Sequence, residues 1–245
     1  MDQSQIVFGV RALIETIEAK RPITKVYLQK GNSGELFKEL EQLLRKNSIR
    51  PSYVPIEKLN KLAKGNHQGA VAAISPVDFR SFETVVEAVL ETAKTPLFLL
   101  LDQITDVRNF GAIIRTSECT GVNAIIVPKT GAAPINSVAI KTSAGAALTL
   151  PIAQVDHIKD AVYYLQASGV QVVAATEKAT QDLYEVNFKK PTALIMGSED
   201  KGIASSLLKL ADYSAKLPML GKISSLNVSV ACGAFLYEIV RQRHT

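Results

Sequence analysis

The sequence predicts an α/β protein whose C-terminal part carries a parallel sheet and whose N-terminal part is a smaller α/β domain. From residue 96 onward, short apolar runs alternate with helical patterns, and this alternation favours a parallel sheet covered by helices on both faces. The runs are residues 97–101, 124–127, 170–174, 193–196 and 214–217. The chain has 245 residues, 47% of them hydrophobic, so it can form one large or two modest domains with a buried core.

Residues 1–75 are predicted to form the smaller domain. Its expected elements are a helix over 7–17, a strand over 25–28, a helix over 35–46, and strands over 53–55 and 70–74. The second helix is indicated by the helical spacing of Leu36, Leu40, Leu43 and Leu44. Residues 76–94 are expected to be a short linker and a leading helix, with an apolar stripe at Val85, Val86, Val89 and Leu90. Residues 95–245 then form the second domain.

The net charge of +5 lies entirely in the first domain. Residues 1–75 hold 12 Lys and Arg against 7 Asp and Glu, whereas the remaining residues hold 16 of each kind. Such an excess suits RNA phosphates, whose neutralisation releases counterions, although a solvated helix face with mixed signs at Lys38, Glu39 and Glu41 is the simpler alternative. We favour RNA. The basic residues concerned are Lys25, Lys30, Arg45, Lys46, Arg50, Lys58, Lys61 and Lys64.

Several other classes of protein are disfavoured by the composition. No apolar run is long enough to span a bilayer, and the first residues lack the basic and apolar parts of a signal peptide. Cys119 and Cys232 have neither metal-like nor redox-like spacing, so we expect a cytoplasmic protein without a metal. The glycines of residues 197–202 are spaced as in a phosphate-binding loop, but Ile203 stands where a lysine is needed. No dinucleotide fingerprint or triad nucleophile is evident.

Polar side chains gather in three turns of the predicted second domain. The strand over 97–101 leads to Asn109 and to a helix whose first turns are expected at residues 111–115, ending on Arg115. The strand over 193–196 leads to Glu199. Ser225 and Asn227 directly precede an apolar helical pattern, so they lie at a helix N-terminus. This position suits a carboxylate, a phosphate or a ribose oxygen, although Ser and Asn are also the commonest capping residues.

These segments resemble the SpoU family of S-adenosylmethionine-dependent RNA ribose 2′-O-methyltransferases, within the SPOUT class. The three motifs of that family are matched, in order, by residues 109–115, by residues 196–199 with Gly202, and by residues 217–219 through 225–227. Residues 142–146 and 150–152 are also similar. In the first domain, residues 67–70 match best the ribosomal-protein-like RNA-binding domain of the family. Ser224, where relatives often carry an acid, departs from the pattern.

The resemblance implies a fold, a cofactor and a set of site residues. The expected fold is an α/β trefoil knot, with S-adenosylmethionine bound in the knot and two subunits completing the site. Arg115 would bind the target phosphate and polarise the hydroxyl group, because an arginine pKa above about 12 is unsuited to a base. The implied catalytic residues are Arg115, Asn109, Glu199, Ser225 and Asn227. The implied cofactor-binding residues are Gly197, Leu217, Leu226, Met219 and Thr176.

The substrate implied by the resemblance is RNA, not DNA or a membrane. A first domain of this kind is more similar to the branch that methylates a guanosine ribose in bacterial 23S ribosomal RNA than to the tRNA branch. A tRNA ribose methyltransferase, or an RNA-binding ribosome-assembly factor without turnover, are the alternatives. The lone His67 is expected to make a loop hydrogen bond more readily than an RNA contact.

Overall fold

A computed structural model describes residues 5–19, 21–75, 77 and 79–244. The chain divides into two compact units. Unit 1 extends to residue 78 and includes Pro134–Ser137, and unit 2 comprises Phe79–Ala133 and the chain from Val138 onward. Pro76 and Asp78 of the predicted linker, and the first four residues used in the signal-peptide argument, lie outside the described residues. No helix among the described residues is long and apolar enough to cross a membrane.

Unit 1 is a sheet with helices on both faces. Its strand order is β1-β4-β2-β3, with β2 and β3 parallel and the other neighbours antiparallel. Val26 and Leu28 pack with α1 and α2 in one apolar cluster, whereas Tyr27, on the opposite face, packs with residues of α3. The elements are β1 (Gln5–Phe8), α1 (Val10–Glu18), β2 (Ile23–Gln29), α2 (Glu35–Lys46), β3 (Pro51–Val54), α3 (Ile56–Leu62) and β4 (Ala70–Ile74).

The helix predicted over residues 7–17 is wrong at its start. Residues 5–8 form strand β1, and the helix α1 begins only at Val10. The strand forms because β1 pairs antiparallel with β4, with Phe8 opposite Val71. Gly9 separates the two elements with a φ of 98°, a conformation that favours glycine. A partner more than sixty residues away in sequence therefore decides against the local helical pattern.

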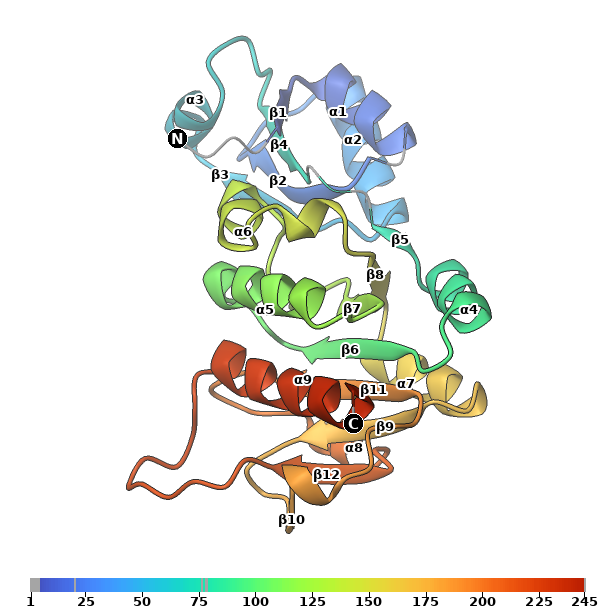
Figure 1. Ribbon diagram of the computed structural model, residues 1–245. Helices are drawn as coiled ribbons and strands as arrows, with labels where there is room; N and C mark the ends of the chain where they lie inside the picture. Colours follow the sequence, from blue (N-terminus) through green and yellow to red (C-terminus); the bar gives the residue numbers. More distant parts are fainter. Residues whose placement is uncertain (1–4, 20, 76, 78, 245) are drawn as a thin grey trace. The chain divides into compact units, whose positions relative to one another are not determined.

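Unit 2 is built on a parallel sheet (Figure 1). In the described part of the chain the strand order is β10-β12-β9-β11-β6-β7-β8-β5, and every neighbouring pair is parallel. The five predicted strands are confirmed, and β5, β8 and β10 are additions at or near the two edges. The strands are β5 (Arg80–Ser81), β6 (Leu97–Asp102), β7 (Ala124–Pro128), β8 (Ile152–Val155), β9 (Gln171–Ala175), β10 (Gln181–Asp182), β11 (Thr192–Gly197) and β12 (Tyr213–Lys216).

Helices cover both faces of this sheet, and the central strands are therefore buried throughout. Phe98 and Leu100 of β6 pack with residues of α4 and α7, so the intervening residues of the strand face the other side of the sheet. On that side α9 contacts the neighbouring strand β11 and packs against α5. The predicted helix before Arg115 begins earlier than expected, at Val107, because Asp106 caps it. The helices are α4 (Phe82–Thr92), α5 (Val107–Cys119), α6 (Ser137–Thr142), η1 (Ala146–Leu148), α7 (Ile158–Ala167), η2 (Leu183–Glu185), α8 (Ser205–Leu208) and α9 (Val228–His244).

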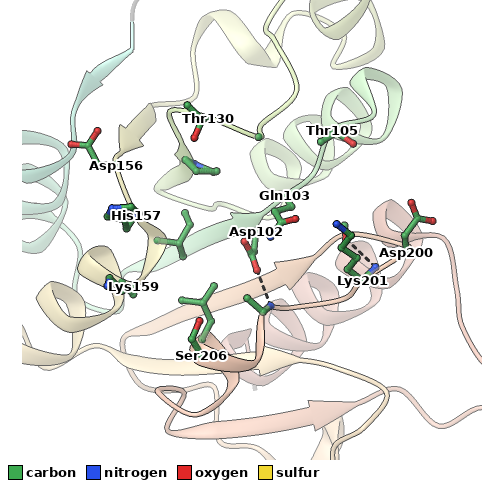
Figure 2. Close-up of a pocket in the computed structure, with 16 residues that line it drawn as sticks. Asp102, Gln103, Thr105, Thr130, Asp156, His157, Lys159, Asp200, Lys201 and Ser206 are labelled. Atoms are coloured by element: carbon green, nitrogen blue, oxygen red, sulfur yellow. Dashed lines mark hydrogen bonds between the residues drawn. The ribbon is translucent and has the colours of Figure 1, made fainter. Parts of the chain in front are cut away.

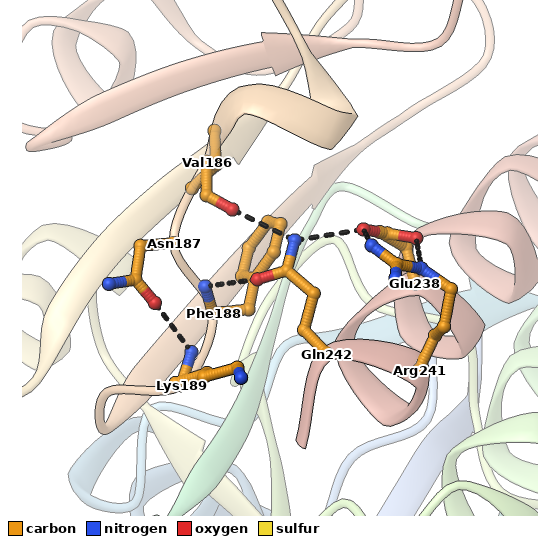
Figure 3. A network of polar contacts seen from close by, with 7 residues as sticks. All are labelled: Val186, Asn187, Phe188, Lys189, Glu238, Arg241 and Gln242. Carbon is orange, nitrogen blue, oxygen red and sulfur yellow. Dashed lines mark hydrogen bonds and ion pairs between the residues drawn. The ribbon is translucent and has the colours of Figure 1, made fainter. Parts of the chain in front are cut away.

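A buried polar network fixes the C-terminal end of α9 (Figure 3). The Gln242 side chain accepts a hydrogen bond from the Phe188 backbone N–H at 2.9 Å and donates to the Val186 carbonyl at 3.0 Å. It also donates to Glu238 at 2.8 Å, and Arg241 donates two further hydrogen bonds to the same carboxylate, both at 2.8 Å. The network ties the last helix to the segment that precedes β11.

We expect Glu238→Gln to lower the free energy of unfolding at neutral pH by about 1–3 kcal/mol, because an amide replaces the acceptor of three hydrogen bonds. The hydrogen bonds from Arg241 hold the pKa of the Glu238 carboxyl below its ordinary value of 4.5. This stabilisation is therefore present above pH 4.5 and is lost as the pH falls through the lower pKa of the folded state.

Urea unfolding at a series of pH values checks the prediction. The stability gap between the wild type and Glu238→Gln should narrow in acid. The exposed Glu91 of α4 provides a control, since Glu91→Gln should leave stability nearly unchanged at every pH. A gap that stays constant into strong acid would contradict the assigned role of the carboxylate.

Candidate functional site

The three polar turns meet at the carboxyl ends of β6 and β11, which are neighbouring strands. Asn109 of α5 donates a hydrogen bond from Nδ2 to Glu199 Oε1 at 3.2 Å. Asn227 donates from Nδ2 to the same Glu199 oxygen at 2.6 Å and to Asn109 Oδ1 at 3.0 Å. We call Asn109, Glu199 and Asn227 the Glu199 triad. The sequence predicted these three residues for one site, and the structure brings them into direct contact.

The Glu199 carboxylate occupies the N-terminus of helix α9. Glu199 Oε1 accepts a hydrogen bond from the Val228 backbone N–H at 3.2 Å, so one unpaired donor of the helix start is satisfied. The positive end of the helix dipole also favours a carboxylate there. The sequence predicted that this helix start suits an anion, and the group that occupies it is a side chain of the protein itself.

Asn227 acts as a helix cap and as a member of the triad at once. Its Oδ1 accepts hydrogen bonds from the Ser229 backbone N–H at 3.0 Å and from the Ser229 hydroxyl at 2.5 Å. Its Nδ2 is thereby directed at Glu199 and Asn109. The two interpretations of this residue, a cap or a functional group, are therefore compatible, because the amide uses a different atom for each.

Helices α5 and α9 run side by side in the same direction. Asn109 contacts Asn227 near the two N-termini, and one to two turns further on, a Cβ added to Gly233 would lie 3.7 Å from the Thr116 side chain. Asp106 caps α5 by accepting hydrogen bonds from the backbone N–H groups of Arg108 and Asn109, at 2.9 and 2.8 Å. This cap directs the first turn of α5 and with it Asn109.

A small hollow lies beside the triad, at the carboxyl ends of β9, β11 and β12. We call it the apolar hollow because Met196, Leu217 and Phe235 are among its walls. Its lining includes Thr176, Leu217, Met219 and Leu226, four of the five residues predicted to bind the cofactor, together with Ser225. Ser225, Leu226 and Asn227 are consecutive, so one short segment links the hollow to the triad.

Gly197, the fifth of these residues, does not line the hollow. A Cβ added to Gly197 would lie only 2.2 Å from backbone atoms of Gly202 and Ile203, which is closer than atoms can approach. Ser198 and Gly202 form an isolated β-bridge across the same turn. Glycine is therefore required so that the turn carrying Glu199 can close tightly against the end of β11.

Arg115 is not part of the triad. It is exposed on α5 and makes no hydrogen bond or ion pair with the residues that the structure describes. Six residues separate it from Asn109, which corresponds to about 9 Å along the helix. The catalytic role of Arg115 remains a prediction.

Asp102, at the end of β6, is a site residue that sequence reasoning did not select. It is buried, and its Oδ2 accepts a hydrogen bond from the Ala204 backbone N–H at 2.8 Å. The bond joins the end of β6 to the turn after β11 and so supports the position of Glu199. The signal in the sequence is that Asp102 directly follows five apolar residues, so the buried strand carries its carboxylate into the interior. A buried aspartate needs a hydrogen-bond partner, which indicates a structural or functional role.

Comparison with known proteins agrees with this geometry. Residues 96–237 match the model of the SpoU rRNA Methylase family, and residues 6–80 match that of the RNA 2′-O ribose methyltransferase substrate binding domain. The chain belongs to the SpoU rRNA methylase family. The family match spans the three polar turns, the apolar hollow and the Glu199 triad.

Similar relatives cover almost the whole chain. The 23S rRNA (guanosine-2′-O-)-methyltransferase RlmB of Pseudomonas aeruginosa is 37% identical over 246 residues, covering 99% of this chain and 98% of that protein. RlmB of Vibrio cholerae is 34% identical and covers 98% of each chain. The similarity to these relatives therefore spans both units of this chain.

Solved structures of the family are similar in fold. The SpoU methyltransferase AviRb of Streptomyces viridochromogenes, in complex with the cofactor AdoMet, is 27% identical with a TM-score of 0.61, covering 98% of this chain and 90% of that chain. The A. aeolicus TrmH/SpoU tRNA modifying enzyme is 32% identical with a TM-score of 0.57, covering 66% and 83%. These similarities confirm the predicted α/β fold with its parallel sheet.

The Gly197→Ala substitution should destabilise unit 2 by about 1–3 kcal/mol or more. The new methyl group would clash with backbone atoms of Gly202 and Ile203, which cannot move aside as a flexible side chain can. Gly233→Ala on α9 is the matched control. Its methyl group would make an ordinary contact at 3.7 Å and should stabilise the helix by up to about 1 kcal/mol. Thermal and urea unfolding of the two variants checks this, and equal effects would refute the close approach at Gly197.

Proposed function

We propose that this protein transfers a methyl group from S-adenosylmethionine to the 2′-hydroxyl of a guanosine ribose in 23S ribosomal RNA. The observation that carries the proposal is the contiguity of the apolar hollow and the Glu199 triad through Ser225, Leu226 and Asn227. The RlmB relatives, which are about as long as this chain, support the choice of substrate.

The residues of the apolar hollow fit S-adenosylmethionine. Leu217, Met219 and Leu226 offer apolar contacts for an adenine ring, and Thr176 adds a hydroxyl group. At about 100 Å³ the hollow is smaller than a typical ligand pocket of about 300 Å³ or more, so cofactor binding requires movement of the loop before α9. That loop is exposed, with Leu220 99% and Ile223 76% accessible. The cofactor supplies the electrophilic methyl group.

The triad is suited to hold the acceptor ribose. Glu199 Oε1 is occupied by three N–H donors, whereas Oε2 makes no hydrogen bond within the described part of the chain. Oε2 is therefore available to accept a hydrogen bond from the ribose hydroxyl. Fixing two reactants in a near-attack geometry is worth roughly 7–11 kcal/mol, so this orientation is the main contribution of the protein. Arg115 would bind the neighbouring phosphate.

We further propose a homodimer in which a second copy covers the exposed face of α5 and α9. Val230 and Tyr237 on α9 are 56% and 57% exposed, although both are large and apolar. Arg115 is exposed on the adjacent helix. A second copy on this face would bury the apolar side chains and enclose Arg115 in the site. The proposed ribosomal substrate supports a cytoplasmic location.

Unit 1 would bind the RNA backbone at Tyr27. The ammonium groups of Lys25 and Lys58 lie 5.3 and 5.5 Å from the centre of the Tyr27 ring. Neither lysine has an ion pair among the residues that the structure describes, although the two positive charges repel each other. A phosphate would relieve this repulsion, so the pair is the RNA contact that we propose for the basic first domain.

His67 contributes to the loop and not to this contact. Its Nδ1 accepts a hydrogen bond from the Gly69 backbone N–H at 3.1 Å, so its Nε2 carries the proton and donates to Asn60 Oδ1 at 2.8 Å. The side chain is buried, with both ring nitrogens used. The loop hydrogen bond expected from the sequence is confirmed.

A tRNA ribose is the second candidate substrate, favoured by the 32% identity to the A. aeolicus tRNA modifying enzyme. That protein matches only 66% of this chain, whereas the RlmB relatives match unit 1 as well. The presence of unit 1 is the observation that favours ribosomal RNA.

Transfer of labelled methyl from S-adenosylmethionine to unmodified ribosomal RNA tests the proposed reaction. We expect a product that resists alkaline cleavage, because the methylated 2′-oxygen can no longer attack the phosphate. Glu199→Gln and Arg115→Ala should each lower kcat/KM by about 10²-fold or more, since both groups are proposed to act on the reacting nucleotide. The exposed Glu91→Gln on α4 should leave it unchanged.

Other outcomes of this assay would contradict the proposal. Label in tRNA alone would favour the second candidate. Binding of S-adenosylmethionine without transfer to either RNA, or to a preribosomal particle, would favour an assembly factor without turnover.

The Lys25→Ala/Lys58→Ala double variant tests the RNA contact of unit 1. We expect weaker RNA binding. The slope of log K against log salt concentration should become shallower by about 1.4–1.8, as for the loss of two phosphate contacts. Lys189→Ala/Lys209→Ala, in exposed positions of unit 2, removes the same charge and should preserve the slope. Filter binding over a salt series provides the measurement, and equal slopes for both double variants would refute the contact at Tyr27.

A further inference from the structure

A second and larger cavity lies in unit 2, at the carboxyl ends of β6, β7 and β8 (Figure 2). Its volume of about 540 Å³ is within the range of about 300–1,000 Å³ that small-molecule sites occupy. The carboxyl edge of a parallel sheet is also where α/β proteins bind their ligands. No residue assigned to the apolar hollow or to the Glu199 triad lines this cavity.

The cavity, the triad and the hollow follow one another along the sheet. The hollow lies at the ends of β12, β9 and β11, the triad at the ends of β11 and β6, and the cavity at the ends of β6, β7 and β8. Ser198 and Asp200, on either side of Glu199, both line the cavity. A ligand in the cavity is therefore adjacent to the carboxylate that we propose for the acceptor ribose.

Two lysines without partners lie on opposite sides of the cavity. Lys159 is in the first turn of α7 and Lys201 is in the turn after β11, and Figure 2 shows them well apart. Neither ammonium group has an ion pair or hydrogen bond among the described residues. Asp156, by contrast, is paired with Lys129 at 2.9 Å. Asp102 and Asp200 are the other carboxylates in the lining, and Asp200 lies beside Lys201.

Between the lysines, hydrogen-bonding side chains surround an apolar floor. Gln103 has a φ of 58°, which is rare for a residue other than glycine and is typical of functional sites. Its amide can both donate and accept. Asp102 uses one oxygen to bind the Ala204 N–H, which leaves the other as an acceptor. Ile158 and Leu207 supply apolar surface for a flat ring.

We infer that this cavity binds the RNA nucleotide whose ribose is methylated, with its base over Ile158 and Leu207 and its 5′ and 3′ phosphates at Lys159 and Lys201. An internal nucleotide of an RNA strand carries a phosphate on each side of its ribose. Two phosphates match the two separate lysines better than the single phosphate of a mononucleotide would. The Asp102 carboxylate then accepts hydrogen bonds from the N1–H and N2–H groups of guanine, and the Gln103 amide donates to O6. This inference rests on the proposed RNA methyl transfer.

Guanosine 3′,5′-bisphosphate is the probe for the test, titrated into the full-length ¹⁵N-labelled protein while the backbone amide signals are followed by NMR. We expect the signals of Gln103, Thr130 and Lys159 to shift. Lys159→Ala and Lys201→Ala should each weaken binding about tenfold, because each loses one charge-assisted contact. Neither should change the binding of unphosphorylated guanosine. The exposed Lys209→Ala is the matched control and should bind like the wild type.

A separate titration with S-adenosylmethionine distinguishes the two proposals. Shifts at Thr176 and Leu217 support the cofactor hollow whatever the bisphosphate does, and their absence would count against the proposed function itself. Shifts of the cavity signals by the cofactor alone would overturn the inference. Bisphosphate binding that neither Lys159→Ala nor Lys201→Ala weakens would also overturn the inference. A bound bisphosphate that unmodified ribosomal RNA fails to displace would overturn it as well, because the ligand would then be a free nucleotide.

Discussion

The contact between the Glu199 carboxylate and the start of helix α9 is the interaction on which the site depends. One oxygen accepts hydrogen bonds from Asn109, Asn227 and the Val228 backbone, and so joins segments 28 to 90 residues apart in sequence. Each of these segments follows or precedes a different element of the parallel sheet. The anion satisfies a helix start that water or a ligand would otherwise occupy, and it fixes the loop after β11 relative to α5 and α9.

Helix α9 is held at its other end by a second set of buried polar contacts. Gln242 binds the backbone of Val186 and Phe188, and Arg243 donates hydrogen bonds to the carbonyl groups of Thr95 and Lys190 at 2.7 and 3.0 Å. Burial lowers the pKa of the Arg243 guanidinium below its ordinary value. A helix fixed at both ends can hold Asn227 in a constant position while the exposed loop before it moves. Rigidity of the triad and mobility of the cofactor loop are thus compatible in one chain segment.

The two units divide the recognition of a polyanion between them. Unit 1 carries the excess positive charge, and Tyr27 with its two lysines concentrates part of it at one point. Unit 2 has a net charge of only +1, with 16 Lys and Arg against 15 Asp and Glu. Its carboxyl edge holds an apolar hollow, a single carboxylate with two amides, and a polar cavity with two separate cations. Long-range attraction therefore belongs to the first unit, whereas selection of one ribose requires the short-range hydrogen bonds of the second.

The sequence by itself determined the class of the fold, the five central strands and the residues of the three motifs, because continuous apolar runs and turn residues are local signals. Only the tertiary structure decided that residues 5–8 form a strand, since the partner of β1 is β4. It also decided that Asp102 supports the turn of Glu199, and that Gly197 is needed for a backbone approach and does not line the hollow. These features depend on atoms distant in sequence, which no local pattern contains.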